Sequence, residues 1–247
     1  MMNGRTPFYY SAVIVLLAVV VVGGLDRHGR SARIFGTAGA LGDPRVEIAL
    51  TATPQEAFRL WKQRGYKGRT VVFIGEQWKR IDPSQYFEAP LYRQYPLKLY
   101  NLAEKQEREY LSADNILYFA DLSGIARQIT AVLGKTGFSQ LAVQAPQARN
   151  VKFRDGEIFM THHGFPRTFT TAEHFRAGRE PVLLYVNADY FRADEPEILL
   201  RQLMQSGLTT DCVILCSQTG DTSVSATERT KLERFAGLMR MQGRVLP

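Results

Sequence analysis

The hydrophobic positions of this chain fall into short, separated runs. The most compact run, 181–191 (PVLLYVNADYF), has five apolar or aromatic residues in a row before Asn187 and Asp189. An uninterrupted run of this kind is typical of a strand that is buried on both faces in a parallel sheet. Polar residues at the carboxyl ends of such strands line the ligand crevice, so the sequence predicts a site around Asn187 and Asp189.

The remaining runs alternate between strand and helix patterns. Strands are predicted at 46–50, 69–74, 115–120, 140–144, 151–153, 158–160 and 212–216, with a hairpin turn at 154–157. Helices are predicted at 53–64, 101–111, 123–134, 194–207 and 225–240, and 80–98 is read as a packed loop. Capping boxes open three of the helices, at Thr53–Glu56, Asp194–Glu197 and Ser225–Glu228. Strands separated by capped helices predict a three-layer α/β domain with a mainly parallel sheet and helices on both faces.

A different pattern marks the N-terminus, where residues 8–25 contain no charge. With the two uncharged residues before it, this stretch reaches the roughly 20 residues needed to cross a bilayer. The predicted organisation is therefore a short tail (1–7), a single transmembrane helix (8–25), a linker (26–45) and one α/β domain (46–247). A cleaved signal peptide is the alternative, but the nearest A-x-A pattern, at 38–40, lies too far beyond the apolar stretch.

The charge distribution bears on orientation and partners. Arg27, Arg30 and Arg33 follow the apolar stretch, whereas Arg5 is the only basic side chain before it, so the positive-inside rule places the domain in the cytoplasm. The net charge of +7 favours an anionic neighbour. Because the 31 lysines and arginines are scattered rather than grouped with aromatic residues, a lipid surface is favoured over nucleic acid, with the three arginines at the head groups.

Three local features suggest chemistry and each has a simpler interpretation. Gly134–Gly137 (GKTG) lacks the first glycine of a P-loop and is read as following a helix, so we interpret it as a helix end. Cys212 and Cys216 lie four apart on one strand, roughly 13 Å from each other, and are predicted to be free buried thiols. The histidines show no metal-binding spacing, so they are read as loop residues.

The order of these segments resembles the arginase/deacetylase-like α/β proteins. The segments that carry the resemblance are a helix at 53–61 with Trp-x-x-x-Gly, then VVFIGEQWK, NILYFADLSGIARQITAVLG, QLAVQAP and LLYVNADYF. The last of these is similar to the Asp-x-Asp-Tyr-Phe motif of the peptide-arginase branch. The resemblance covers roughly residues 45–240 and implies a binuclear site, usually of manganese, that activates a water for hydrolysis of a guanidinium group.

The metal ligands implied by the resemblance are largely replaced. Gly75, Gln77 and Lys79 stand where the family has Asp-x-His-x-Asp, and Asn187 stands for the first aspartate of the later motif. Only Asp189 is retained. A binuclear site needs several anionic or imidazole ligands, so the resemblance implies a vestigial crevice of Gly75, Gln77, Lys79, Asn187 and Asp189. We expect the Lys79 ammonium to pair with Asp189 where the family holds metal.

These features predict a membrane-anchored, non-catalytic domain that is an accessory or scaffolding subunit of a membrane protein complex, with no cofactor. The alternative is a metal-dependent hydrolase of guanidinium or amide bonds with a rebuilt manganese or zinc site. Its ligands would come from Asp189, Glu76, His162, His163 and Asp194. A third interpretation is a peptide-binding module with an exposed apolar patch at the strand ends.

Overall fold

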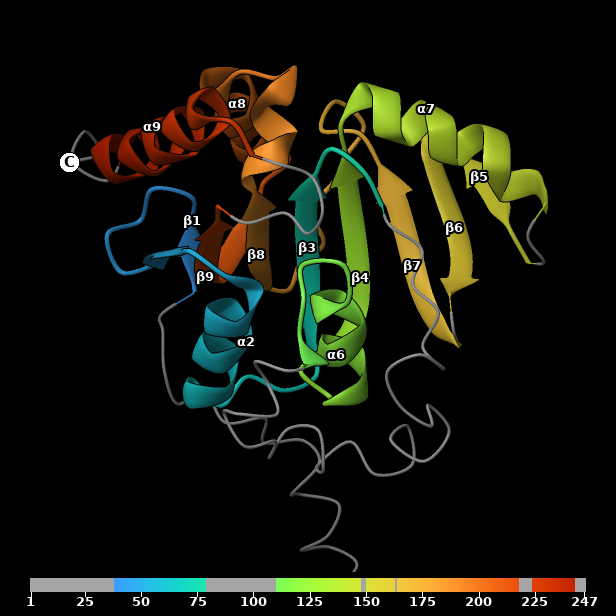
Figure 1. Cartoon of the computed structure of the whole chain (residues 1–247), viewed down its shortest axis with the longest axis horizontal. Helices are drawn as coiled ribbons and strands as arrows, with labels where there is room; N and C mark the ends of the chain where they lie inside the picture. Colours follow the sequence, from blue (N-terminus) through green and yellow to red (C-terminus); the bar gives the residue numbers. More distant parts are fainter. Residues whose placement is uncertain (1–37, 79–109, 148–149, 163, 218–223, 243–247) are drawn as a thin grey trace, which may run out of the picture. The chain divides into compact units, whose positions relative to one another are not determined.

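The fold is an α/β arrangement built on a mostly parallel, mixed sheet (Figure 1). The computed structural model describes residues 38–78, 110–147, 150–162, 164–217 and 224–242. The chain divides into two compact units, Met1–Ile34 and Phe35–Pro247, and every described residue belongs to the second. The predicted membrane helix, the three linker arginines, Lys79, the loop expected at 80–98 and residues 101–109 of the expected helix 101–111 lie outside the described residues. Within the described ranges, no helix has the length and hydrophobicity needed to span a bilayer.

The strands of the sheet are β1 (Gly39–Ala40), β2 (Glu47–Thr51), β3 (Arg69–Gly75), β4 (Ala126–Leu133), β5 (Lys152–Arg154), β6 (Glu157–His162), β7 (Phe165–Thr170), β8 (Val182–Asn187) and β9 (Thr209–Cys216). The helices are α2 (Pro54–Gln63), α6 (Ile116–Leu122), α7 (Lys135–Gln144), α8 (Pro196–Gln205) and α9 (Ala226–Gln242), with short 3-10 turns η2 (Ala145–Gln147) and η3 (Ala188–Arg192).

The sheet order is β1-β9-β8-β3-β4-β7-β6-β5, with β2 also paired to β9. Strands β2, β9, β8, β3, β4 and β7 are mutually parallel, whereas β1, β6 and β5 pair antiparallel to their neighbours. The β5–β6 hairpin has the predicted turn, in which Asp155 and Gly156 both adopt positive φ. A central strand such as β8, between β3 and β9, is therefore enclosed within the sheet and must bury both of its faces.

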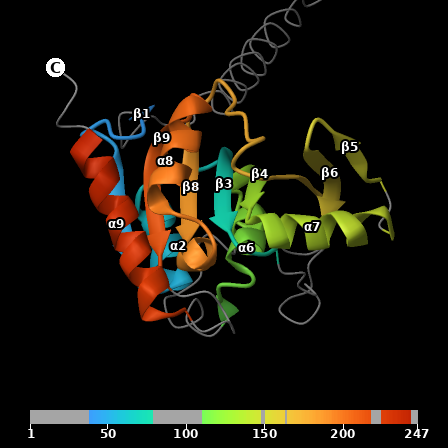
Figure 2. The same cartoon turned by 90° about the horizontal axis from the view of Figure 1, so that it is seen from above.

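Two apolar layers enclose the central strands, as the unbroken hydrophobic runs predict. In β3, Val71 and Phe73 face one layer with α2 and α6, while Val72 and Ile74 face the other with α8 and α9. All six residues of β8 are buried. Figure 2 shows α8 and α9 near β8 and β9, with α7 toward β4 and β6. The domain thus has helices on both faces, because strands that are apolar on both sides require cover on both.

Capping boxes open two of the five described helices, α2 and α9. At α2 the Thr53 hydroxyl accepts the Glu56 backbone N–H, and the Glu56 carboxylate accepts the Thr53 N–H in return. Ser225 and Glu228 make the same reciprocal bonds before α9. The expected box at Asp194–Glu197 is wrong, because α8 begins one residue later at Pro196. Its N-cap residue Glu195 makes no cap bond and instead accepts from the Lys231 ammonium at 2.7 Å.

Three predicted elements between 115 and 144 have the wrong type. The expected strand 115–120 is the helix α6, the expected helix 123–134 contains the strand β4, and the expected strand 140–144 lies in α7. Every residue of α6 is buried, so it lacks the polar stripe by which a helix is recognised, and a short, mainly apolar run is ambiguous between strand and helix. The strand β7 was not predicted. Neither Cys212 nor Cys216 forms a disulfide, and both are buried on the same face of β9, as expected.

Candidate functional site

The connections of the sheet diverge between β3 and β8. The chain leaves β3 toward β4 on one side, and it leaves β8 toward β9 on the other. In open parallel sheets this divergence leaves a crevice at the carboxyl ends of the two strands, where ligands bind. Glu76 follows β3 directly, and Asn187 ends β8 two residues before Asp189. We call Glu76, Asn187 and Asp189 the switch-point cluster.

A backbone hydrogen bond joins the two acidic residues of this cluster. The Glu76 backbone N–H donates to Asp189 Oδ1 at 3.2 Å, so the chain after β3 is tied to the 3-10 turn after β8. Asp189 is 9% exposed, Glu76 6% and Asn187 4%. This burial places two acidic groups in a region where water solvates them poorly, which disfavours their charged forms.

The electrostatics of the cluster follow from that burial. Burial raises the pKa of Asp189 to about 6, although the hydrogen bond from Glu76 N–H and the charge of Arg192 oppose the shift. The pKa of Glu76 is raised first by burial and then by the negative charges of Asp189 and Asp194. Both carboxyl groups therefore keep a proton to a higher pH than exposed acids would, and the Asp189 charge adds to this effect at Glu76.

Two glycines bring the Glu76 side chain against the start of α7. A Cβ at Gly134 would overlap the Glu76 carboxylate, and a Cβ at Gly137 would overlap the Glu76 backbone oxygen. Nothing larger than glycine fits at these two positions without moving residue 76. Within the described part of the chain, Glu76 Oε2 and Asn187 Oδ1 are buried with no hydrogen-bond partner. These two oxygens are the unsatisfied acceptors of the cluster, and such groups need an explanation.

A cavity of about 140 Å³ lies beside the cluster, and two of the residues that border it, Lys135 and Glu173, were not recognised as site residues from the sequence. Lys135 and Glu173 pair at 2.7 Å on its rim, and Tyr190 and Asp194 also line it. Lys135 follows β4 and Glu173 follows β7. Both strands were assigned wrongly or not at all from the sequence, so the residues at their carboxyl ends could not be recognised as neighbours of Asp189.

The structure brings together only part of the predicted site. Gly75 ends β3, and Gln77 is exposed beyond Glu76. Lys79 lies outside the described residues, so its pairing with Asp189 stays a prediction. His162 ends β6, where it pairs with the first residue of β7. It therefore lies at the amino-terminal edge of the parallel strands, opposite the switch-point cluster, and His163 is outside the described residues.

The GKTG segment occupies a different place from the expected one. It follows the strand β4, and Gly134 is the N-cap residue of α7 rather than the end of a helix. The chain passes from strand to helix through this single residue, so there is no loop that would wrap a phosphate. A P-loop would need its first glycine at position 129, but that residue is Ile129, within β4. This agrees with the interpretation that the segment is not a P-loop.

One further buried acid lies far from the strand ends. Asp121, in α6, forms a buried ion pair with Arg167 of β7, whose guanidinium also lies over the rings of Trp78 and Phe165. Burial raises the pKa of Asp121 to about 7, against the opposing charge of Arg167. Because both side chains are enclosed, the pair connects α6 to β7 and offers no access to a ligand.

Among the described residues, no three His, Cys, Asp or Glu side chains lie together in an arrangement that would hold a metal ion. The cluster itself supplies two carboxylates and one amide oxygen, which is fewer charged ligands than two divalent cations require.

Comparisons with models of known families, with curated proteins and with solved structures found no match to this chain.

Proposed function

We propose that this chain is a membrane-anchored, non-catalytic domain related to the arginase-like α/β proteins, which serves as an accessory subunit of a membrane protein complex. Residues 8–25 would be the anchor, Arg27, Arg30 and Arg33 would lie at lipid head groups, and the domain would lie in the cytoplasm. The observation that carries the proposal is the packing of the switch-point cluster. Asp189 accepts a hydrogen bond from the protein backbone, and the Glu76 carboxylate lies against Gly134.

The packing around Glu76 supports a silent site. Asp189, the one ligand retained from the family motif, accepts a hydrogen bond from the protein backbone instead of facing a cavity. The Glu76 carboxylate lies against Gly134, and Gln77 points to solvent. A water-activating binuclear centre needs ligands that converge on open space, and these residues are arranged for close packing instead.

The test is purification of the full chain from its native membranes in mild detergent, with protein stoichiometry and metal content read from the same sample. We expect a partner protein at a fixed ratio and less than about 0.1 manganese or zinc per chain, a level that leaves nearly all sites empty. Asp189→Asn should leave the partner ratio unchanged, and a variant without residues 8–25 should leave the membrane fraction. One or two metals per chain, with no partner, would overturn the proposal.

A second candidate is a hydrolase with a rebuilt metal site, and one observation favours it. Glu76 Oε2 and Asn187 Oδ1 are buried without partners beside Asp189, and oxygen ligands of this kind suit a hard divalent cation such as manganese. One ion held by Glu76, Asn187 and Asp189 would supply a polarised water for hydrolysis of a guanidinium or amide group. If this is the function, both Asp189→Asn and Glu76→Gln must lose the metal, while the surface control Glu233→Gln keeps it.

A further inference from the structure

A polar area interrupts the face of the sheet that α8 and α9 cover. Val182, Thr70 and Gln128 are neighbours in one cross-strand row over β8, β3 and β4. The next row runs from Val72 through Thr130 and Thr168 to Phe159, from β3 to β6. On this face the central strands therefore present hydroxyl and amide groups where the rest of the layer is apolar.

The polar rows explain why no helix of the described residues packs on this area. An apolar helix laid on Thr70, Gln128 and Thr130 would remove their polar atoms from water without giving them hydrogen bonds, which is costly. Instead the connection from β7 to β8 crosses this face as an irregular segment, residues 171–181. Phe175 anchors that segment in the core with 2% exposure, whereas Arg176 and residues 178–180 are exposed.

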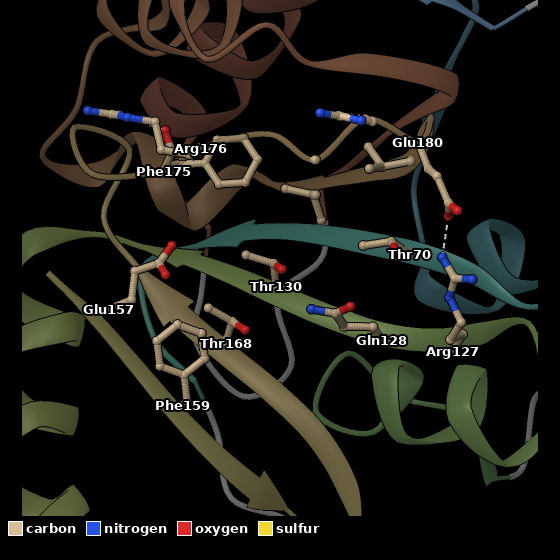
Figure 3. A pocket seen from close by; sticks show the side chains of 14 residues that line it. Thr70, Arg127, Gln128, Thr130, Glu157, Phe159, Thr168, Phe175, Arg176 and Glu180 are labelled. Carbon is tan, nitrogen blue, oxygen red and sulfur yellow. Dashed lines mark hydrogen bonds and ion pairs between the residues drawn. The ribbon is translucent and has the colours of Figure 1, made fainter. Parts of the chain in front are cut away.

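Between the crossing segment and the polar rows lies a groove of about 370 Å³ (Figure 3). This is the size of a pocket for a small organic molecule. Its floor is Thr70, Gln128, Thr130 and Thr168, and Phe159 adds an aromatic surface. Figure 3 shows Glu157 and Arg127 at the two ends of the floor, with Arg176 on the crossing segment above it.

Arginines dominate the charge of the groove. Arg127, Arg176 and Arg179 line it, together with Glu157 and Glu180. Arg127 and Glu180 form an ion pair, so their charges offset each other at the rim. Arg176 donates to the backbone oxygens of residues 173 and 175, which fixes its guanidinium on the wall. The charged side chains outside this pair are Arg176, Arg179 and Glu157, so the groove has a net positive charge.

The floor and the wall have unused hydrogen-bonding capacity. In the part of the chain that the structure describes, the side chains of Thr130, Thr168, Gln128 and Arg179 make no hydrogen bond or ion pair with protein. A guanidinium matches the geometry of a carboxylate or phosphate, and threonine hydroxyls and a glutamine amide both donate to and accept from hydroxyl groups. The two kinds of group face each other across one groove.

From this arrangement we propose that the groove binds a small organic anion, in which a carboxylate or phosphate group is attached to a body that carries several hydroxyl groups. The anionic group lies against Arg176 and Arg179, and the hydroxyl groups lie over the threonine and glutamine floor. This site lies on the face of the sheet, away from the switch-point cluster at the strand ends, and it does not depend on the function proposed for that cluster.

The test is calorimetric titration of the full chain in mild detergent with four probes: glucose 6-phosphate, gluconate, glucose and inorganic phosphate. We expect saturable binding of glucose 6-phosphate or gluconate with a Kd below about 1 mM, and binding of glucose and of inorganic phosphate at least about tenfold weaker. Whichever of glucose 6-phosphate and gluconate binds more tightly shows whether the groove prefers a phosphate or a carboxylate. If glucose binds as tightly as the two sugar anions, the groove does not recognise the anionic group. If inorganic phosphate binds as tightly as they do, the threonine and glutamine floor does not recognise the hydroxyl groups.

Matched variants locate the site. The double variant Arg176→Gln/Arg179→Gln should weaken binding by about tenfold or more, and Thr130→Val by about threefold, since one neutral hydrogen bond is lost. The control Arg201→Gln/Arg240→Gln removes the same charge from exposed positions of α8 and α9 and should change binding less than about twofold. An equal loss in the control, or no saturable binding of any probe, would overturn the proposal.

Discussion

Replacing Asp189 by asparagine tests how much the ionised, buried carboxylate of the switch-point cluster destabilises the fold. The Asp189 carboxyl has its pKa raised from 3.8 to about 6, chiefly by burial. Between about pH 4 and pH 6 the folded chain therefore keeps a proton that the unfolded chain has released, and stability falls as the pH rises through this window. A shift of about two pKa units corresponds to about 3 kcal/mol, which the ionised carboxylate costs the fold at pH 8.

Asparagine keeps an oxygen that accepts the Glu76 backbone N–H but cannot ionise. We expect Asp189→Asn to raise the free energy of unfolding at pH 8 by about 1–3 kcal/mol and to flatten its dependence on pH between 4 and 6. Removing the Asp189 charge also lowers the pKa of Glu76 toward its ordinary value, because that charge helps to raise it. This lower pKa of Glu76 also raises the free energy of unfolding at pH 8.

The assay is urea unfolding of the full chain in mild detergent at pH 4, 5, 6 and 8, followed by circular dichroism. Glu233→Gln, an exposed carboxylate on α9, is the control and should shift stability by less than about 0.5 kcal/mol. A loss of stability in Asp189→Asn at pH 8, or an unchanged pH dependence, would refute the reasoning. Either result would mean that the ionised carboxylate is stabilised by the fold.

Three further predictions concern the packing around the site. Arg167→Met should lower the free energy of unfolding by about 3–5 kcal/mol, because it leaves Asp121 buried without its partner, and adding Asp121→Leu should restore most of the loss. In urea titrations Gly137→Ala should destabilise by about 1–3 kcal/mol through overlap with the Glu76 backbone, whereas Gly237→Ala, within α9 and with open space, should stabilise by about 0.5–1 kcal/mol. Cys212 and Cys216 should react with iodoacetamide at pH 8 only after unfolding, because both are buried and burial raises the pKa of Cys212 to about 12; rapid alkylation of the folded chain, read by mass spectrometry, would contradict this.

Much of the candidate site could be predicted from local sequence. The apolar run that ends at Asn187 indicated a buried strand, and the rule for strand ends then drew attention to Asp189. Glu76 entered only as one ligand of an alternative metal site. Its place in the cluster depends on β3 and β8 being adjacent in the sheet, although residues 76 and 189 are 113 positions apart in the chain. No local pattern encodes that pairing.

The segment between 115 and 144 shows where local reasoning fails. In β4, Gln128 and Thr130 face the groove while Ile129 and Ala131 face the core, which is the two-residue period of a strand. Residues 123–134 were assigned to a helix from the sequence, so this two-residue period was not recognised. The role of the polar positions becomes visible only when β3 and β7 lie on either side, and the groove was missed with them.

The sequence by itself determined the elements that carry strong local signals: the capped helices α2 and α9, the hairpin of β5 and β6, and the doubly buried strands β3, β8 and β9. These signals act within a few residues, through hydrogen bonds at helix ends, turn conformations and continuous apolar runs. Tertiary structure alone decided the order of the strands, the type of α6 and β4, and the meeting of Glu76 with Asp189. Each of these depends on which distant surfaces are buried together, and burial is a property of the assembled fold.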